Sequence, residues 1–382
     1  MALLHQKFPP DIRVEKEALS LAQAGHNVFV LTLKIDGQLD FENFEGFYIV
    51  RLNLLKRHRF IIRFFFTNLI SLYQIPKIVK KYNIGVLHVH EITYALLVVI
   101  LGKLLRKKVV FDVHEYYVSS AEADLKKKGV LGQFFLGFMK LSEKMTCRLA
   151  SKVVVATWGL AERLDRLGVS RDKIVTILNV ANIEMLKKVT TTAVREKKFK
   201  EKFVVSYVGG FSTPRGLDTL IRALPLVVRE VPNVHILLVG DGDAKESLVE
   251  LCQQLDLMRY VTFTGRVSFR KAMEYVQISD LGVIPYHSTP QTEVAIPHKI
   301  FQYMYFEKPV IVSSVRSLKK IVKETKCGMV FRTDDYEMLA KKIIDAAQNP
   351  MIRREMGEMG RFFVEKEYNW EIEKRKFLPI YS

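Results

Sequence analysis

Cysteine is scarce in this sequence, and long apolar runs are absent. Only three cysteines occur among 382 residues, and they lie too far apart to predict a disulfide framework or a cysteine-ligated metal site: Cys147, Cys252 and Cys327. The longest apolar stretch, Ile92 to Leu101, is too short to span a bilayer. No secretory signal is visible in the opening residues. We therefore expect a reduced, cytoplasmic protein.

Acidic residues are also scarce, but only in part of the chain. The formal net charge is +18; residues 51–190 hold 25 Lys and Arg against 10 Asp and Glu, whereas residues 1–50 hold 4 against 7. A surplus of cations confined to one region indicates an anionic partner, either nucleic acid or a membrane surface. Because no RNA-binding module is visible, we expect no nucleic-acid partner.

The segment Arg51 to Thr67 contains no acid at all. It mixes five cations with Leu, Ile and four Phe, and its cations are Arg51, Lys56, Arg57, Arg59 and Arg63. One interpretation is a helix of the first domain with a solvated basic face. The other is an amphipathic patch that lies on anionic lipid, which predicts peripheral association with the inner face of a membrane.

The segment Val204 to Asp243 has the clearest pattern in the chain. An apolar run from Val204 to Val208 is followed by glycines and a polar loop, then by apolar residues at helical spacing, and then by a second apolar run that ends in Gly240. This order predicts strand, Gly-rich turn, helix and strand, and so a parallel sheet. Such a turn lets a phosphate approach the backbone and the start of the helix. A tight turn without a ligand remains the alternative, and Arg215 favours the phosphate site because it adds a cation there.

Both halves of the chain alternate short apolar runs with helical patterns. We therefore predict an α/β protein of two domains, residues 1–190 and 200–365, with 187–202 as a charged linker. The strands expected in the first half are 28–33, 85–90, 109–114 and 153–156. Ligands of open α/β sheets bind at the carboxyl ends of strands, where His114 and Glu115 fall.

Several segments, in this order, resemble the retaining glycosyltransferases of family 4, also called glycosyl transferases group 1. They are FPPDIRVEKEALSLAQAGHNVFVLT, VVFDVHEYY, YVGGFSTPRGLDTLIRAL, LLVGDGD, VTFTGRV and AIPHKIFQYMYFEKPVIVSS. The resemblance implies the GT-B fold, in which two Rossmann-like domains face each other across a cleft. It further implies that the C-terminal domain binds a nucleotide-sugar, that the N-terminal domain binds the acceptor, and that the last helix, 366–382, returns to the first domain.

The resemblance assigns a donor site to the second domain. The family's diphosphate loop appears here as Gly209 to Gly216, where Arg215 falls on the family's lysine and Gly210 replaces its arginine. The leaving diphosphate would therefore depend on Arg215 and Lys299. Arg266 and Val267 are further donor-binding candidates.

Two residues stand where the family carries a pair of glutamates. Glu293 matches the first and would lie near the donor sugar, whereas Gln302 replaces the second, with eight residues between them in place of seven. Gln302 can still accept from a ribose hydroxyl, but its amide also brings N–H donors. Donor binding is therefore expected to be weaker.

His114 matches a family histidine that contacts the donor sugar, and Pro10, Asp11 and Arg13 are the acceptor-binding candidates. The resemblance implies catalysis by positioning and by stabilisation of the leaving diphosphate, with His114, Arg215 and Glu293 as catalytic residues. We expect no cofactor and no metal. His88 and His90 alternate on one strand, and Asp241-Gly242-Asp243 reads as the turn after a Rossmann strand.

These residues predict a glycosyltransferase that moves a sugar from a nucleotide-sugar to a glycan or lipid-linked acceptor in cell-surface polysaccharide or glycolipid synthesis. Two alternatives remain. One is a nucleotide-sugar-binding protein whose activity is weakened at Gly210 and Gln302. The other is a nucleotide-sugar epimerase of the same fold.

Overall fold

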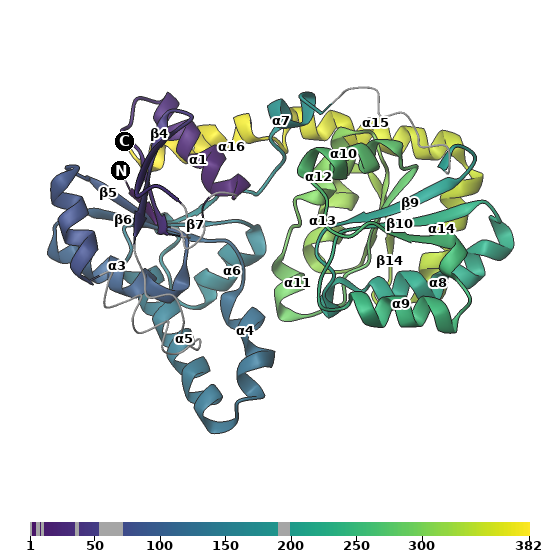
Figure 1. Cartoon of the computed structure of the whole chain (residues 1–382), viewed down its shortest axis with the longest axis horizontal. Coiled ribbons are helices and arrows are strands. Elements are labelled where there is room, and N and C mark those ends of the chain that lie inside the picture. The colour runs from purple at the N-terminus through teal and green to yellow at the C-terminus, as the bar shows by residue number, and fades with distance from the viewer. Residues whose placement is uncertain (1, 5–7, 9–10, 35–37, 53–71, 190–198) are drawn as a thin grey trace. The chain divides into compact units, whose positions relative to one another are not determined.

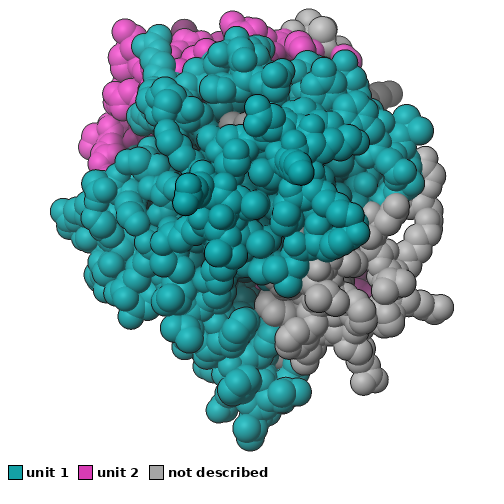
Figure 2. Space-filling view, turned by 90° about the vertical axis from the view of Figure 1, so that its left-hand side faces the viewer, with its two compact units in different colours: residues 1–178, 373–382 teal, residues 179–372 magenta. Residues whose placement is uncertain are grey.

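The computed structural model describes residues 2–4, 8, 11–34, 38–52, 72–189 and 199–382. The chain divides into two compact units, and Figure 2 colours them separately. Unit 1 comprises residues 1–178 and 373–382, and unit 2 comprises residues 179–372. Each unit is an α/β structure with helices on both faces of its sheet (Figure 1). The expected α/β class is therefore confirmed.

The sheet of unit 1 has eight strands in the order β3-β4-β2-β1-β5-β6-β7-β8. The strands are β1 (Ala2–Leu4), β2 (Phe29–Leu33), β3 (Phe41–Phe44), β4 (Phe47–Leu52), β5 (Val86–Val89), β6 (Lys108–Val113), β7 (Lys152–Val155) and β8 (Ile174–Thr176). Only β3 and β4 pair antiparallel, as a hairpin at the edge. The central strands are short apolar runs because helices cover both of their faces.

The helices of unit 1 follow its strands. They are α1 (Ile12–Gln23), α3 (Ile92–Leu104), α4 (Tyr117–Lys126), α5 (Gly129–Leu149) and α6 (Trp158–Arg166). Helix α1 begins at Asp11, whose carboxylate accepts from the backbone N–H groups of Arg13 and Val14, at 2.9 and 3.0 Å. Helix α3 is apolar on nearly every side and is largely buried.

Unit 2 has six strands, all parallel, in the order β11-β10-β9-β12-β13-β14. They are β9 (Phe203–Val208), β10 (Val234–Val239), β11 (Val261–Phe263), β12 (Leu281–Ile284), β13 (Val310–Ser313) and β14 (Gly328–Phe331). The helices are α7 (Ile183–Lys187), α8 (Leu217–Glu230), α9 (Lys245–Gln254), α10 (Phe269–Ile278), α11 (Pro290–Val294), α12 (Lys299–Tyr305), α13 (Arg316–Thr325), α14 (Tyr336–Gln348) and α15 (Pro350–Lys366).

Numbered along the chain, the strand order of unit 2 is 3-2-1-4-5-6, the order of the Rossmann fold. The order reverses between β9 and β12, so the loops after these two strands diverge and leave room for a ligand. In unit 1 the same reversal falls between β1 and β5. These two switch points are where a binding site is expected in each sheet.

The unit boundaries differ from the predicted ones at both ends. Unit 2 begins at Asn179, before the predicted linker, because α7 packs on α12. Helix α16 (Trp370–Phe377) contains the return to unit 1, where a Glu373 carboxylate oxygen accepts from the Leu178 N–H at 2.9 Å. The C-terminal residues thus lie in unit 1, although the return comes at Glu373 and not at 366.

Most of the basic segment predicted to lie on lipid is outside the described residues. Arg51 is described, and it corrects the prediction at that position. It lies in β4 with 6% of its surface exposed, its Nη2 is 2.6 Å from the Glu42 Oε2, and its Nη1 donates to the Leu39 carbonyl. Arg51 is therefore a structural residue of the sheet edge. Among the described residues, no helix is both long and apolar enough to cross a membrane.

Candidate functional site

The Gly-rich loop lies between β9 and α8, as the sequence predicted, and the strand order places it at the switch point of unit 2. It leaves β9 at Gly209 and enters α8 at Gly216, which has a φ of 64°. A Cβ on Gly216 would lie 1.9 Å from the Pro285 carbonyl oxygen, so only glycine lets the loop pass this close to the segment after β12. The His287 N–H also donates to the Pro214 carbonyl, at 3.1 Å. The loop is therefore held against the end of the neighbouring strand.

Two cations meet two tyrosine rings beside this loop. The Lys299 Nζ lies 3.6 Å from the ring centre of Tyr207 and 5.7 Å from that of Tyr286, and the Arg215 guanidinium carbon lies 4.6 Å from the latter. Lys299 is only 5% exposed. A Cβ on Gly209 would come within 2.6 Å of its Nζ, so the glycine makes room for the ammonium group.

No carboxylate of the described residues forms an ion pair with Arg215 or Lys299. Burial, and then the charge of Arg215, lower the pKa of Lys299 well below its usual value. The ring faces of Tyr207 and Tyr286 stabilise cations, but only in part. The arrangement can therefore accept an anion, which would favour the charged form of Lys299.

The two residues of the glutamate pair occupy different surroundings. The Glu293 Oε1 accepts from the Ser288 hydroxyl at 2.6 Å, and its Oε2 accepts from the Arg316 N–H, at the start of α13, at 2.8 Å. This carboxylate therefore already joins two segments of unit 2. Gln302 is 6% exposed and lies in α12, one turn after Lys299. Their roles toward a donor remain predictions.

The other donor-binding candidates flank the same edge of the sheet. Arg266 is exposed, Val267 is half-buried, and the preceding Gly265 pairs with Gly240 at the end of β10. The Asp241 carboxylate accepts from the Gly242 N–H at 2.9 Å and lies 3.4 Å from the Lys245 ammonium. The carboxylate of Asp241 is thus used within the turn, in agreement with its interpretation as the end of a Rossmann strand.

His287 was not identified from the sequence, although its hydrogen bonds link the segments around this loop. Its Nε2 lies 2.9 Å from the Asp218 Oδ1, and its Nδ1 hydrogen-bonds to Asp334. Burial alone would lower the pKa of His287, but the two carboxylates outweigh it and raise the pKa. Tyr207 and Tyr286 were missed as well. The available signal was an aromatic residue near the end of each switch-point strand.

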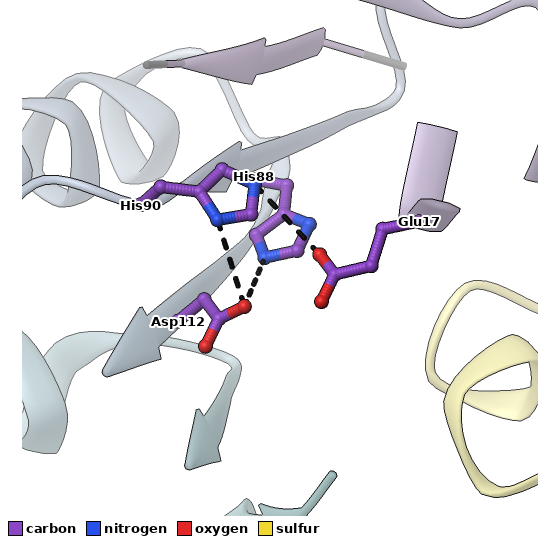
Figure 3. A group of neighbouring side chains, drawn as sticks. All are labelled: Glu17, His88, His90 and Asp112. Carbon is purple, nitrogen blue, oxygen red and sulfur yellow. Dashed lines mark ion pairs between the residues drawn. The ribbon is translucent and has the colours of Figure 1, made fainter. Parts of the chain in front are cut away.

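Unit 1 carries a second cluster of ionisable groups, next to its own switch point. His88 of β5, His90 just after it, Asp112 of β6 and Glu17 of α1 point toward one another (Figure 3). All four are buried, with at most 1% of their surface exposed. One ligand atom from each lies within 4.8 Å of the others. Residues of these types could hold a metal ion.

Two further residues of α1 supply positive charge to this cluster. Arg13 binds Asp112 through Nε and Nη2, each at 3.0 Å, and its Nε lies 3.1 Å from the Glu17 Oε1. Lys16 is also buried, and burial together with Arg13 lowers its pKa to about 7. Burial raises the pKa of Glu17, whereas Arg13 and His114 hold the pKa of Asp112 well below its usual value despite its burial. Arg13 thus pairs with both carboxylates of the cluster within the same unit.

His114 lies at the edge of this cluster, at the end of β6. Its Nε2 is 2.8 Å from the His90 Nδ1 and 3.5 Å from the Asp112 Oδ2, and 23% of its side chain is exposed. Of the acceptor-binding candidates, Pro10 lies outside the described residues. Asp11 caps α1, and Arg13 is buried with donors bound to Asp112 and the Ile177 carbonyl. Acceptor binding by these residues remains a prediction, and the structure gives Arg13 a structural role.

Two family models match this chain, one in each half. That of the glycosyl transferases group 1 matches residues 189–362, and that of glycosyltransferase family 4 matches residues 13–184. An uncharacterized glycosyltransferase of Methanocaldococcus jannaschii is 24% identical over 72% of this chain and 68% of its own. The capsular polysaccharide biosynthesis glycosyltransferase CapM of Staphylococcus aureus is 22% identical over 63% and 64%.

Solved structures identify the fold. The sucrose-phosphate synthase of Thermosynechococcus elongatus matches with a TM-score of 0.79 and 22% identity, over 100% of this chain and 97% of its own. Anabaena HepE in complex with UDP matches with a TM-score of 0.76 and 12% identity, over 99% and 98%. The fold is therefore the GT-B type. Because the family matches account for both units, the chain belongs to the group 1, family 4 glycosyltransferases and is a glycosyl-transferring enzyme.

Proposed function

We propose that the protein transfers a sugar from a nucleotide-sugar, bound in unit 2, to a glycan or lipid-linked acceptor, with retention of the anomeric configuration. The observation that carries this proposal is the pair Arg215 and Lys299, two cations that share tyrosine faces beside the Gly-rich loop without a described carboxylate partner. Burying an ammonium group without a counter-charge is costly. The diphosphate of a nucleotide-sugar supplies that counter-charge.

The position of the pair suits a diphosphate for a second reason. The loop ends at the start of α8, where unpaired N–H groups and the helix dipole favour an anion. The bound complex of Anabaena HepE contains UDP, and that protein shares the fold. We therefore place the nucleoside diphosphate along 209–216, with its negative charge between Arg215 and Lys299.

In this mechanism the enzyme acts on the leaving group. Charge develops on the diphosphate as its bond to the anomeric carbon breaks, and the two cations stabilise that charge most strongly in the transition state. The departing phosphate oxygen accepts the acceptor's proton on the same face of the sugar, which retains the configuration without a protein nucleophile. His114 and Glu293 are predicted to contact the donor sugar, and no cofactor or catalytic metal is assigned.

We propose a cell-surface glycan or a lipid-linked precursor of one as the acceptor. The similarity to CapM, which is named for capsular polysaccharide biosynthesis, supports this class of product. An acceptor of this class is made from nucleotide-sugars at the cytoplasmic face of a membrane, and we place the protein there as a peripheral protein. Residues 53–67 of the basic segment predicted to contact lipid lie outside the described residues.

Gln302 favours a second candidate, a donor-binding protein with weakened activity. It replaces the family's second glutamate inside a buried helix. Both oxygens of a glutamate accept from ribose hydroxyls, whereas the amide of Gln302 has one acceptor oxygen and an NH₂ group that only donates. The substitution Gln302→Glu distinguishes the two: tighter nucleotide binding with a large gain in turnover favours the weakened protein. Turnover that changes little favours an enzyme already adapted to the amide.

A thermal-shift panel of nucleoside diphosphates, followed by turnover of the matching nucleotide-sugars, tests the proposal. A bound diphosphate should raise the melting temperature by mass action, and Lys299→Ala should remove that shift. Lys271→Ala is the matched control, because Lys271 also stacks on a tyrosine, Tyr275, but has a carboxylate partner in Glu274 at 3.3 Å. If no nucleoside diphosphate shifts the wild type and no nucleotide-sugar is consumed, the proposal is wrong.

A further inference from the structure

Helices α4 and α5 form a hairpin that projects from unit 1 (Figure 1). Its inner face has a small core of its own, built from Val118, Leu125 and Leu136. The two helices approach so closely at Gly132 that a Cβ there would lie 1.8 Å from the Leu125 carbonyl oxygen. The hairpin is therefore a packed element whose inner apolar residues are buried against one another.

The outer face of α5 is apolar where an amphipathic surface helix would be polar. Val130 is 85% exposed and Phe134 is 77% exposed, although both are large apolar side chains. The exposed residues recur at spacings of three, four and seven, which places them on one side of the helix. The outer face of α5 consists of Val130, Leu131, Phe134, Phe138, Leu141 and Met145.

Positive charge borders this outer face. Lys126 is the last residue of α4, and Lys127 and Lys128 form the turn between the helices. Lys140 and Lys144 lie within α5 beside the apolar residues. The one acid of α5, Glu143, is buried on the other side and is bound by the Arg163 guanidinium at 3.1 and 2.5 Å. The described surface of α5 around the outer face thus presents lysines and no acid, while Glu122 of the neighbouring α4 pairs with Lys126 at 2.9 Å.

We propose that the outer face of α5 docks on an anionic lipid bilayer. Exposed aliphatic and phenylalanine side chains enter the boundary between headgroups and acyl chains, and the flanking lysines bind lipid phosphates. A second copy of the chain fits less well, because a symmetric contact through this face would bring the Lys140 and Lys144 side chains of both copies together. The helix would lie on the bilayer, since no described helix can cross one.

This docking surface is separate from the basic segment predicted from the sequence, and it does not depend on donor chemistry. If the proposed function holds, the bilayer would hold unit 1 beside a lipid-linked acceptor. Vesicle binding and nucleotide binding are measured separately, so either proposal can fail without the other.

Vesicle flotation of the full chain tests the docking surface. The wild type should float with phosphatidylcholine vesicles that contain phosphatidylglycerol, and less so with phosphatidylcholine alone or at high salt. The variant Val130→Ser/Leu131→Ser/Phe134→Ser should lower partitioning by at least about tenfold, because the inserting side chains are lost. The matched control is Met351→Ser/Ile352→Ser/Phe362→Ser, which changes apolar residues of α15 that are 69%, 47% and 49% exposed. It should float like the wild type.

A second variant separates the two basic surfaces. Lys56→Gln/Arg57→Gln/Arg59→Gln/Arg63→Gln leaves α5 intact, and its flotation should still fall when the three serines are added. Wild-type protein that stays with the unbound fraction at low salt overturns the proposal, as does a serine variant that floats like the wild type. A dimer in solution that the serine variant abolishes overturns it too, in favour of a second copy. The melting temperature of the free protein and the far-UV circular dichroism spectrum report that each variant is folded, independently of nucleotide binding.

Discussion

The two units share a Rossmann-type strand order around their switch points. They differ in whether the basic groups near those points have a described counter-charge. In unit 1, Arg13 lies within ion-pair distance of both Glu17 and Asp112, so its charge meets carboxylates of the same unit. In unit 2, Arg215 and Lys299 face tyrosine rings. A buried carboxylate that is paired with a base is costly to leave alone, whereas the buried Lys299 beside the half-buried Arg215 has no described counter-charge and favours an anionic ligand. The difference favours unit 2 for the proposed anion site.

One histidine in each unit, His88 and His287, shows a similar difference in surroundings. His88 is fully buried, its Nδ1 meets the Tyr381 hydroxyl at 2.9 Å, and burial lowers its pKa to about 3. His287 lies between Asp218 and Asp334, which raise its pKa. The first histidine is neutral near pH 7 and belongs to the core, whereas the second hydrogen-bonds to two carboxylates at the rim of the proposed donor site. The same residue type therefore has a structural role in one unit and links loops in the other.

The largest expected effect is the loss of Arg13. Arg13→Met leaves the carboxylate of Asp112 buried without its partner and should destabilise unit 1 by about 3–5 kcal/mol. Lys299→Met, the matched change in unit 2, should cost little or even stabilise, because it removes a buried cation without a counter-charge. Urea unfolding followed by hydrogen exchange of each unit measures both variants. Equal destabilisation by the two changes would contradict the comparison.

Loss of a cation at the proposed donor site should affect turnover. Arg215→Ala should lower turnover by about 10² or more, as expected for one transition-state donor. Lys299→Ala should act similarly, while the melting temperature of the free protein stays close to that of the wild type. Initial rates with the nucleotide-sugar found in the binding panel provide the measurement. Unchanged turnover in a folded Arg215→Ala variant would remove this residue from the site.

Acid should weaken unit 1 through His88. Its pKa is about 3 in the folded protein, below the ordinary value of 6.5, so the unfolded chain binds the proton first as the pH falls. The stability contributed by neutral His88 is complete above about pH 6.5 and is lost toward pH 3, at up to about 1.4 kcal/mol per pH unit. His88→Gln should flatten this dependence while keeping an acceptor for Tyr381. An unchanged slope in stability measured across this range would contradict the assignment.

The smallest expected effect is that of chelation. Excess EDTA should leave turnover within about twofold, because the cations of unit 2 supply the charge that a catalytic metal would supply. Metal analysis of purified protein should give far less than one ion per chain, since the Arg13 guanidinium already lies against both carboxylates of the cluster around His88. A tenfold loss of turnover that Mg²⁺ or Mn²⁺ restores would instead support a metal at Asp241 and Asp243.

Much of the fold could be predicted from local patterns. The apolar run Val204–Val208, the glycines after it and the helical spacing from Leu217 specified a βαβ unit, and β9, α8 and β10 follow that order. The hairpin of β3 and β4 was not predicted, and Arg51 was assigned to a lipid-facing patch. Its ion pair with Glu42 joins two strands of that hairpin, so the buried position of Arg51 depends on a pairing that no local pattern shows.

By itself, the sequence determined the α/β class, the two units, the Gly-rich loop and Arg215 as its cation. Those features follow from periodicity, from glycine's backbone freedom and from residue type, which are local properties. Only the tertiary structure decided that Lys299 meets Arg215 over Tyr207 and Tyr286, because these residues come from segments up to about ninety positions apart that the parallel sheet brings to one edge. It also decided that Arg13 is neutralised by Asp112, since burial and counter-charge are set by neighbours in space.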